Sequence, residues 1–170
     1  MPYSDLAYAK AILPFWKDWD MGDRKGLVGN RGDAPEGAIG CVFLTCFEGA
    51  FTHFANILRY SEIHMHHAAD IEEADFLLTV TGSTVLLTDI VFAEGTWADV
   101  LAMAVEVHPL VAALVVADDV DRDFVADALN RGACGILWKH LDLDQTARMI
   151  RAAHEAATQR LSRHNGPVAA

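Results

Sequence analysis

The chain has 170 residues, of which 52% are hydrophobic, and this is enough apolar material for one domain with a full core. Its net charge of −11 argues against a nucleic-acid-binding surface, which needs clustered Lys and Arg, and against docking on anionic lipid. No apolar run approaches the roughly 20 residues of a membrane span. The N-terminus lacks the pattern of a signal peptide. We therefore expect a cytoplasmic protein with neither a nucleic-acid nor a membrane partner.

Residues 1–37 differ in composition from the rest and are expected to form an N-terminal extension and linker. Ser4 is a candidate N-cap for a short helix. Phe15, Trp16 and Trp19 form a dense aromatic group, which fits either a flap packed on the domain or a partner or dimer surface. The sequence that follows is rich in glycine and charge and is typical of a linker.

From residue 38 onward, patterns of buried strands alternate with patterns of amphipathic helices. Strands are expected at 38–45, 63–68, 84–89, 111–117 and 134–138. Helices are expected at 48–60, 71–78, 97–108, 121–131 and 142–161. Five strands alternating with five helices predict a doubly wound, right-handed parallel α/β sheet. This domain is expected to span 38–162, with a flexible tail at 163–170.

Two of the predicted strands end in a charged residue. The strand at 84–89 ends in Asp89, and Lys139 follows the strand at 134–138. The carboxyl ends of parallel strands share one edge of the sheet, where open α/β sheets place their ligands. Asp89 and Lys139 are therefore expected on the same rim.

The segments DIVFAEGTWADVL and ALNRGACGILWKHL carry a resemblance to the receiver domains of response regulators, the CheY-like family. In that resemblance Asp89 falls on the phosphoacceptor and Lys139 on the invariant lysine, 50 positions later, while His140 stands where proline is usual. The resemblance covers about 38–157. It implies a flavodoxin-like sheet with strand order 2-1-3-4-5 and a signalling rather than an enzymatic role.

The chain departs from the family at the metal site. The family ends its first strand in a pair of acidic residues that hold Mg²⁺, where this chain has Thr45 and Cys46. Mg²⁺ requires oxygen ligands, usually carboxylates. Asp89 and Glu48 are the only candidate metal ligands at this position, with Glu48 depending on an inward fold of its loop. The resemblance implies Mg²⁺, but most of its ligands are missing.

The two switch positions of the family also differ. Ala117 stands at the end of the fourth strand, where the family has Ser or Thr, and Ile136 stands where it has an aromatic residue. We therefore predict an atypical, stand-alone receiver domain with impaired Mg-dependent phosphorylation, in which Asp89 and Lys139 form a structural ion pair. No output domain is expected after the last helix.

Such a domain would act by binding another protein, either a histidine kinase or other signalling protein, or a second copy of itself. The resemblance places the contact on the face formed by the fourth helix, the fifth strand and the fifth helix. The candidate contact residues there are Val125, Leu129, Arg148, Met149 and Arg151.

Other interpretations remain open. Asp89 could accept a phosphoryl group with a rearranged metal site, or the chain could be a small flavodoxin-like enzyme or redox protein. Cys46 is expected to be a buried thiol. His64 and His66 share a face if 63–68 is an edge strand and could chelate zinc or copper, but a polar edge that discourages pairing is the simpler interpretation.

Overall fold

The computed structural model describes residues 37–92 and 94–164. The predictions for Ser4 and the aromatic group at 15–19, and for most of the tail, fall outside the described residues. In chain order the elements are β1 (Ile39–Leu44), α2 (Glu48–Ile57), β2 (Ile63–Ala68), α3 (Ile71–Thr81), β3 (Val85–Asp89), α4 (Trp97–Val107), β4 (Ala112–Ala117), α5 (Arg122–Asn130), β5 (Gly135–Trp138) and α6 (Leu143–His164).

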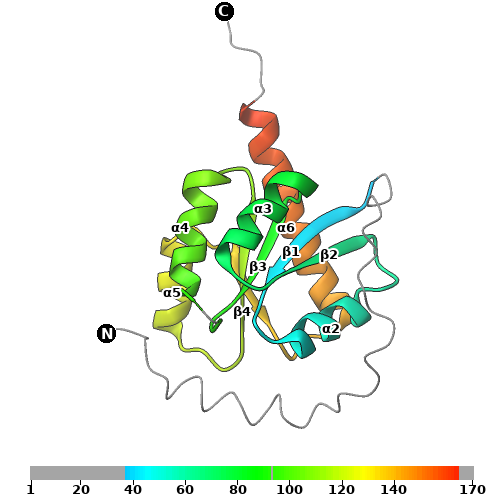
Figure 1. The fold of residues 1–170 in the computed structure, drawn as a ribbon, viewed down its shortest axis with the longest axis vertical. Coiled ribbons are helices and arrows are strands. Elements are labelled where there is room, and N and C mark those ends of the chain that lie inside the picture. The colour runs from blue at the N-terminus through cyan, green and yellow to red at the C-terminus, as the bar shows by residue number, and fades with distance from the viewer. Residues whose placement is uncertain (1–36, 93, 165–170) are drawn as a thin grey trace, which may run out of the picture.

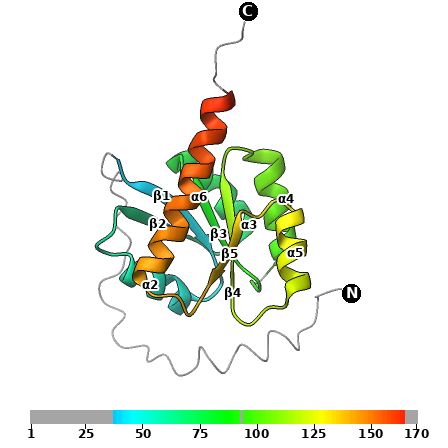
Figure 2. The ribbon, with the colours of Figure 1, turned by 180° about the vertical axis from the view of Figure 1, so that it is seen from behind.

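The five strands form one parallel sheet in the order β2-β1-β3-β4-β5. Helices α3, α4 and α5 cover one face of the sheet (Figure 1), and α2 and α6 cover the other (Figure 2). This confirms the predicted fold class and strand order. Along the chain, β2 is added on one side of β1, and β3, β4 and β5 are added on the other side. Open parallel sheets bind their ligands beyond the carboxyl ends of the strands at such a switch point, which here lies between β1 and β3.

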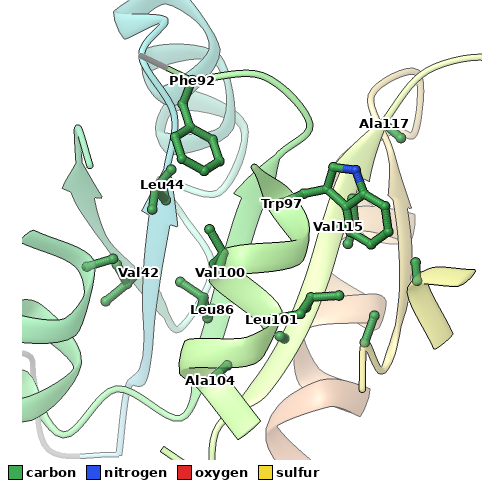
Figure 3. Close-up of a cluster of buried hydrophobic side chains, with 14 of the residues drawn as sticks. Val42, Leu44, Leu86, Phe92, Trp97, Val100, Leu101, Ala104, Val115 and Ala117 are labelled. Atoms are coloured by element: carbon green, nitrogen blue, oxygen red, sulfur yellow. The ribbon is translucent and has the colours of Figure 1, made fainter. Parts of the chain in front are cut away.

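The alternation of side chains along the strands separates the core into two clusters. Val42 and Leu44 of β1 pack with α3 and α4, whereas Cys41 and Phe43 pack with α2 and α6. Figure 3 shows how α4 is fitted to the first cluster, with Trp97 beside Val115 of β4. All residues of β3 and β4 are buried, because helices cover both faces of the central strands.

Local sequence sets the ends of the helices. The side chain of Asp121 accepts a hydrogen bond from the backbone N–H of Phe124 and caps the N-terminus of α5. Gly82, at a φ of 64°, ends α3 in the left-handed region that favours glycine. Helix α3 therefore includes residues 79–81, which the sequence pattern had excluded. Helix α6 continues beyond its predicted end, to residue 164.

A capping box is present at the start of α6. The backbone N–H of Gln145 donates to the Asp142 carboxylate at 2.8 Å, and the backbone N–H of Asp142 donates to the Gln145 side-chain oxygen at 3.3 Å. Each side chain thus satisfies a backbone donor that the first turn leaves without an intrahelical acceptor. This cap fixes where the chain turns between β5 and the last helix.

Strand register determines which residues meet at the carboxyl rim. Leu44 pairs with Thr88, so the next residues, Thr45 and Asp89, lie across from each other. Ala117 of β4 pairs with Trp138 of β5, and Lys139 follows. Residues at or immediately after the carboxyl ends of β1, β3 and β5 therefore lie in one small region of the rim.

Candidate functional site

The candidate site is the buried ion pair between Asp89 and Lys139. The Lys139 ammonium nitrogen lies 3.3 Å from Asp89 Oδ1, and both side chains are at most 5% exposed. The two charges come from β3 and from the residue after β5, with β4 between them. The structure thus brings together the two residues that the strand ends had placed on one rim.

Two further donors surround the carboxylate of Asp89. The backbone N–H of Ile90 donates to Oδ1 at 2.8 Å, and the Thr45 hydroxyl donates to Oδ2 at 3.2 Å. Both oxygens of Asp89 therefore accept hydrogen bonds from within the chain. A buried carboxylate is stable only when its charge is paired and its oxygens are hydrogen-bonded, and this site meets both requirements.

Burial still dominates the protonation equilibrium of Asp89. Loss of solvation raises the pKa of this carboxyl above its usual value, because the charged form is disfavoured away from water. The positive charge of Lys139 and the hydrogen bonds from Ile90 and Thr45 oppose this shift and lower the pKa. Asp89 is only 2% exposed, so the loss of solvation outweighs these opposing contacts.

Thr45 is held from several sides. Its hydroxyl accepts a hydrogen bond from the backbone N–H of Phe47 at 3.1 Å while donating to Asp89. Its carbonyl oxygen lies 2.8 Å from Nε2 of His67 and accepts a hydrogen bond when that nitrogen carries the proton. His67 in turn stacks on Phe51 of α2, with ring centroids 4.8 Å apart. This network places the hydroxyl against the carboxylate of Asp89.

The chain offers few ligands for Mg²⁺ around Asp89. Glu48 is the first residue of α2 and is exposed, and the hydrogen bonds and ion pair of Asp89 within residues 37–92 and 94–164 go to Thr45, Ile90 and Lys139 instead. In that same part of the chain, no group of three or more His, Cys, Asp or Glu side chains could hold a metal ion. Immediately after β1 the chain has the neutral hydroxyl of Thr45 and the thiol of Cys46, whereas Mg²⁺ prefers carboxylate oxygens. The residues present therefore do not fit a Mg²⁺ site.

Cys46 differs from the prediction of a buried thiol. Its side chain is exposed and lies 3.7 Å from the carbonyl oxygen of Val91. It leaves the core because the chain turns outward immediately after Thr45, whose side chain takes the buried position. Partial burial and the charge of Asp89 raise the pKa of this thiol, with Lys139 opposing the shift, so the site disfavours a reactive thiolate.

The two switch positions lie in the core. Ala117 is fully buried and Ile136 is 6% exposed, and both pack in the cluster under α4 and α5. Figure 3 shows Ala117 at the carboxyl end of β4, close to the indole of Trp97. With a methyl group at 117, β4 supplies no hydroxyl at the rim.

A surface hollow lies next to the ion pair. Asp119, Val120, Trp138 and His140 line it, and neither Asp89 nor Lys139 is among its lining residues. Asp119 has a φ of 38°, a left-handed conformation that Asp adopts more readily than most residues. The opening at this rim therefore lies beside the paired charges, beyond the ends of β4 and β5.

The structure distributes the predicted contact residues between surface and core. Leu129 is 47% exposed, and Arg148 and Arg151 are exposed on α6. Val125 and Met149 are partly buried, and each packs against one of the two core clusters. Leu129 and the two arginines are therefore the accessible members of this set.

The histidines of β2 divide between the two faces of the sheet. His64 and His66 lie side by side, with ring centroids 4.7 Å apart, and burial together with the charge of His64 lowers the pKa of His66. His67 points to the opposite face, toward α2. Sequence reasoning missed its bond to Thr45, because nothing in the pattern IHMHH shows which backbone group lies opposite on β1.

Comparison with known proteins adds information on the fold. No protein-family model matches the chain, and no curated protein matches it. Among solved structures, the signal receiver domain of a putative Luxo repressor protein from Vibrio parahaemolyticus is 11% identical, with a TM-score of 0.68 over 76% of this chain and 99% of that one.

Two further solved structures agree. The signal receiver domain of an HD domain-containing protein from Pseudomonas fluorescens Pf-5 is 19% identical, with a TM-score of 0.67 over 74% of this chain and 93% of that one. A CheY-like receiver domain from Methanospirillum hungatei JF-1 is 15% identical, with a TM-score of 0.64 over 72% and 98%. The chain therefore has the fold of response-regulator receiver domains. In the described part of the chain, no helix is long and apolar enough to cross a membrane.

Proposed function

We propose that this chain is an atypical receiver domain that works in signal transduction through protein–protein contacts, with Mg-dependent phosphorylation impaired. The observation that supports this most directly is the state of Asp89. Its carboxylate accepts hydrogen bonds from Thr45 and Ile90 and pairs with Lys139 at 3.3 Å, and β1 supplies neutral groups where the metal would bind.

The chemistry of phosphoryl transfer explains why this matters. A carboxylate that attacks phosphorus needs cations to neutralise the charge on the equatorial oxygens of the transition state. Lys139 supplies one positive charge, but the metal site lacks its acids. The Thr45 hydroxyl and Lys139 also hold the oxygens that would have to reach phosphorus. Ala117 adds no hydrogen bond for a phosphoryl oxygen.

The test is incubation with acetyl phosphate and Mg²⁺, followed by intact-mass spectrometry. We expect no stoichiometric gain of a phosphoryl group, and an unchanged result for Asp89→Asn. An active receiver domain treated in parallel shows that the reagent works. A stoichiometric adduct that disappears in Asp89→Asn would establish the alternative, in which Asp89 is a working phosphoacceptor with a rearranged metal site.

The partner is proposed to be a protein, and the contact face is proposed to be the one built by α5, β5 and α6. Among the candidate contact residues, Leu129 on α5 is an exposed apolar side chain, and Arg148 and Arg151 on α6 are exposed cations. Such a combination suits an acidic protein surface with an apolar centre. A second copy of the chain is the simplest such partner, because the domain itself is acidic.

Light scattering coupled to size exclusion tests the homodimer. If two copies meet on this face, Leu129→Asp should shift the mass toward the monomer, because a buried charge without a partner is costly. Leu161→Asp, which alters an exposed leucine near the other end of α6, serves as the matched control. A mass that is monomeric in the wild type would direct the search to a different protein partner.

A further inference from the structure

The edge strand β2 carries a pair of histidines that the proposed signalling role does not use. His64 and His66 are two positions apart, so their side chains leave the strand on the same face. Met65 packs in the cluster with α2 and α6, and Ala68 packs in the cluster with α3. Alternation therefore places both imidazoles on the α3 side of the sheet.

The two rings contact each other. Their centroids are 4.7 Å apart, with an interplanar angle of 66°, and both side chains are partly exposed at the sheet edge. Among residues 37–92 and 94–164, neither ring takes part in a hydrogen bond or ion pair. Their ring nitrogens are thus not committed to another group of the described fold.

From this placement we propose that His64 and His66 form a bidentate site for a divalent transition metal ion such as Zn²⁺ or Cu²⁺. Imidazole nitrogen is a preferred ligand for these ions, whereas Mg²⁺ prefers oxygen. This site is separate from the carboxyl-rim site at Asp89 and requires no phosphorylation chemistry.

The ring separation is compatible with chelation. A Zn–N bond is about 2.0–2.1 Å, and a ring centroid lies roughly 1.1–1.2 Å behind its nitrogen, so two imidazoles on one ion have centroids about 4.5–5.2 Å apart. The observed 4.7 Å falls within that span. The strand thus holds the two rings close enough for one ion to bind a nitrogen of each.

The fold contributes two ligands to this site. In the described residues no group of three or more His, Cys, Asp or Glu side chains could hold a metal ion, so water completes the coordination. Such a site binds more weakly than a closed structural zinc site, which has four protein ligands. Both side chains are partly exposed, so water can reach the remaining coordination positions.

Isothermal titration of the full chain, purified without a polyhistidine tag, with ZnCl₂ tests the proposal. Every protein carries Cys46→Ser, which removes the exposed thiol as a competing ligand. We expect one Zn²⁺ per chain, and at least tenfold weaker binding in His64→Ala and in His66→Ala. His140→Ala, which alters an exposed histidine at the other side of the sheet, should bind like the parent, and MgCl₂ should give no binding heat at this site.

A second measurement identifies the ligands. The electron paramagnetic resonance spectrum of the Cu²⁺ complex should show two coordinated imidazole nitrogens, and one or none in either alanine variant. Circular dichroism of the metal-free variants checks that they remain folded. Equal Zn²⁺ affinity in all four proteins, or the absence of binding heat in the parent, would overturn the proposal.

Discussion

Two parts of the carboxyl rim differ in the charge of the residues at the ends of their strands. β3 and β5 lead to Asp89 and Lys139, two full charges, whereas β1 and β4 lead to Thr45 and Ala117, which are neutral. The charged part is buried, with Asp89 2% and Lys139 9% exposed. The neutral part contributes one hydroxyl, and that hydroxyl is bonded to Asp89.

The difference shows which charges this rim can retain. One anion and one cation balance each other, so both remain buried at a tolerable cost in desolvation. Two further acids on β1 would leave uncompensated negative charge unless a metal ion were bound. A rim without those acids can therefore keep its ion pair as a structural element, and the following predictions test that division.

The largest effect is expected for Lys139→Ala. Removing the cation leaves a buried carboxylate without its partner, which should lower the free energy of unfolding by about 3–5 kcal/mol. Denaturant unfolding measures this loss, and Arg148→Ala, at an exposed cation of α6, should change stability by less than about 0.5 kcal/mol. An unchanged midpoint for Lys139→Ala would show that the pair does not stabilise the fold.

Restoring the acids of β1 should create metal dependence. In the Thr45→Asp/Cys46→Asp variant, about 10 mM Mg²⁺ should raise the free energy of unfolding by about 1 kcal/mol if the dissociation constant is about 2 mM. The wild type and Glu48→Gln should show no such response in the same thermal melts. A Mg²⁺ response of the wild type that Glu48→Gln abolishes would mean that Glu48 does fold inward.

Thr45→Val should remove the contribution of the neutral part of the rim. The Asp89 carboxylate loses a donor and the Phe47 N–H loses an acceptor, which should cost about 1–2 kcal/mol. Thr45→Ser keeps the hydroxyl and should retain most of the stability. Equal losses for valine and serine would assign the effect to packing of the methyl group instead.

The smallest effect concerns pH. Because burial raises the pKa of Asp89, the folded protein binds a proton at this carboxyl group more tightly than the unfolded chain does. The stabilisation from protonation is complete below the unfolded pKa of about 3.9 and is lost as the pH rises through the raised folded pKa. The stability of the wild type relative to Asp89→Asn should therefore fall as the pH rises above about 4. A rise over that range would mean that Lys139 outweighs desolvation.

Several features were predictable because they depend on neighbouring residues. Helices were expected from residues 121 and 142, and Asp121 and Asp142 cap α5 and α6 there. Cys46 was expected to be buried, yet it is exposed. The residue at which a strand leaves the sheet depends on which side chain forms a hydrogen bond in the folded protein, and a local pattern does not show this. Here the Thr45 hydroxyl donates a hydrogen bond to Asp89, and the chain turns outward after Thr45.

The sequence alone determined the order of strands and helices and the charged ends of β3 and β5, because buried runs and helical periodicity are local properties of the chain. Only the tertiary structure decided that Asp89 is enclosed by Lys139, Thr45 and Ile90, and that His64 and His66 lie 4.7 Å apart with no other described partner. Contacts of this kind depend on strand register, side-chain rotamers and burial, and these are settled only when distant segments pack against each other.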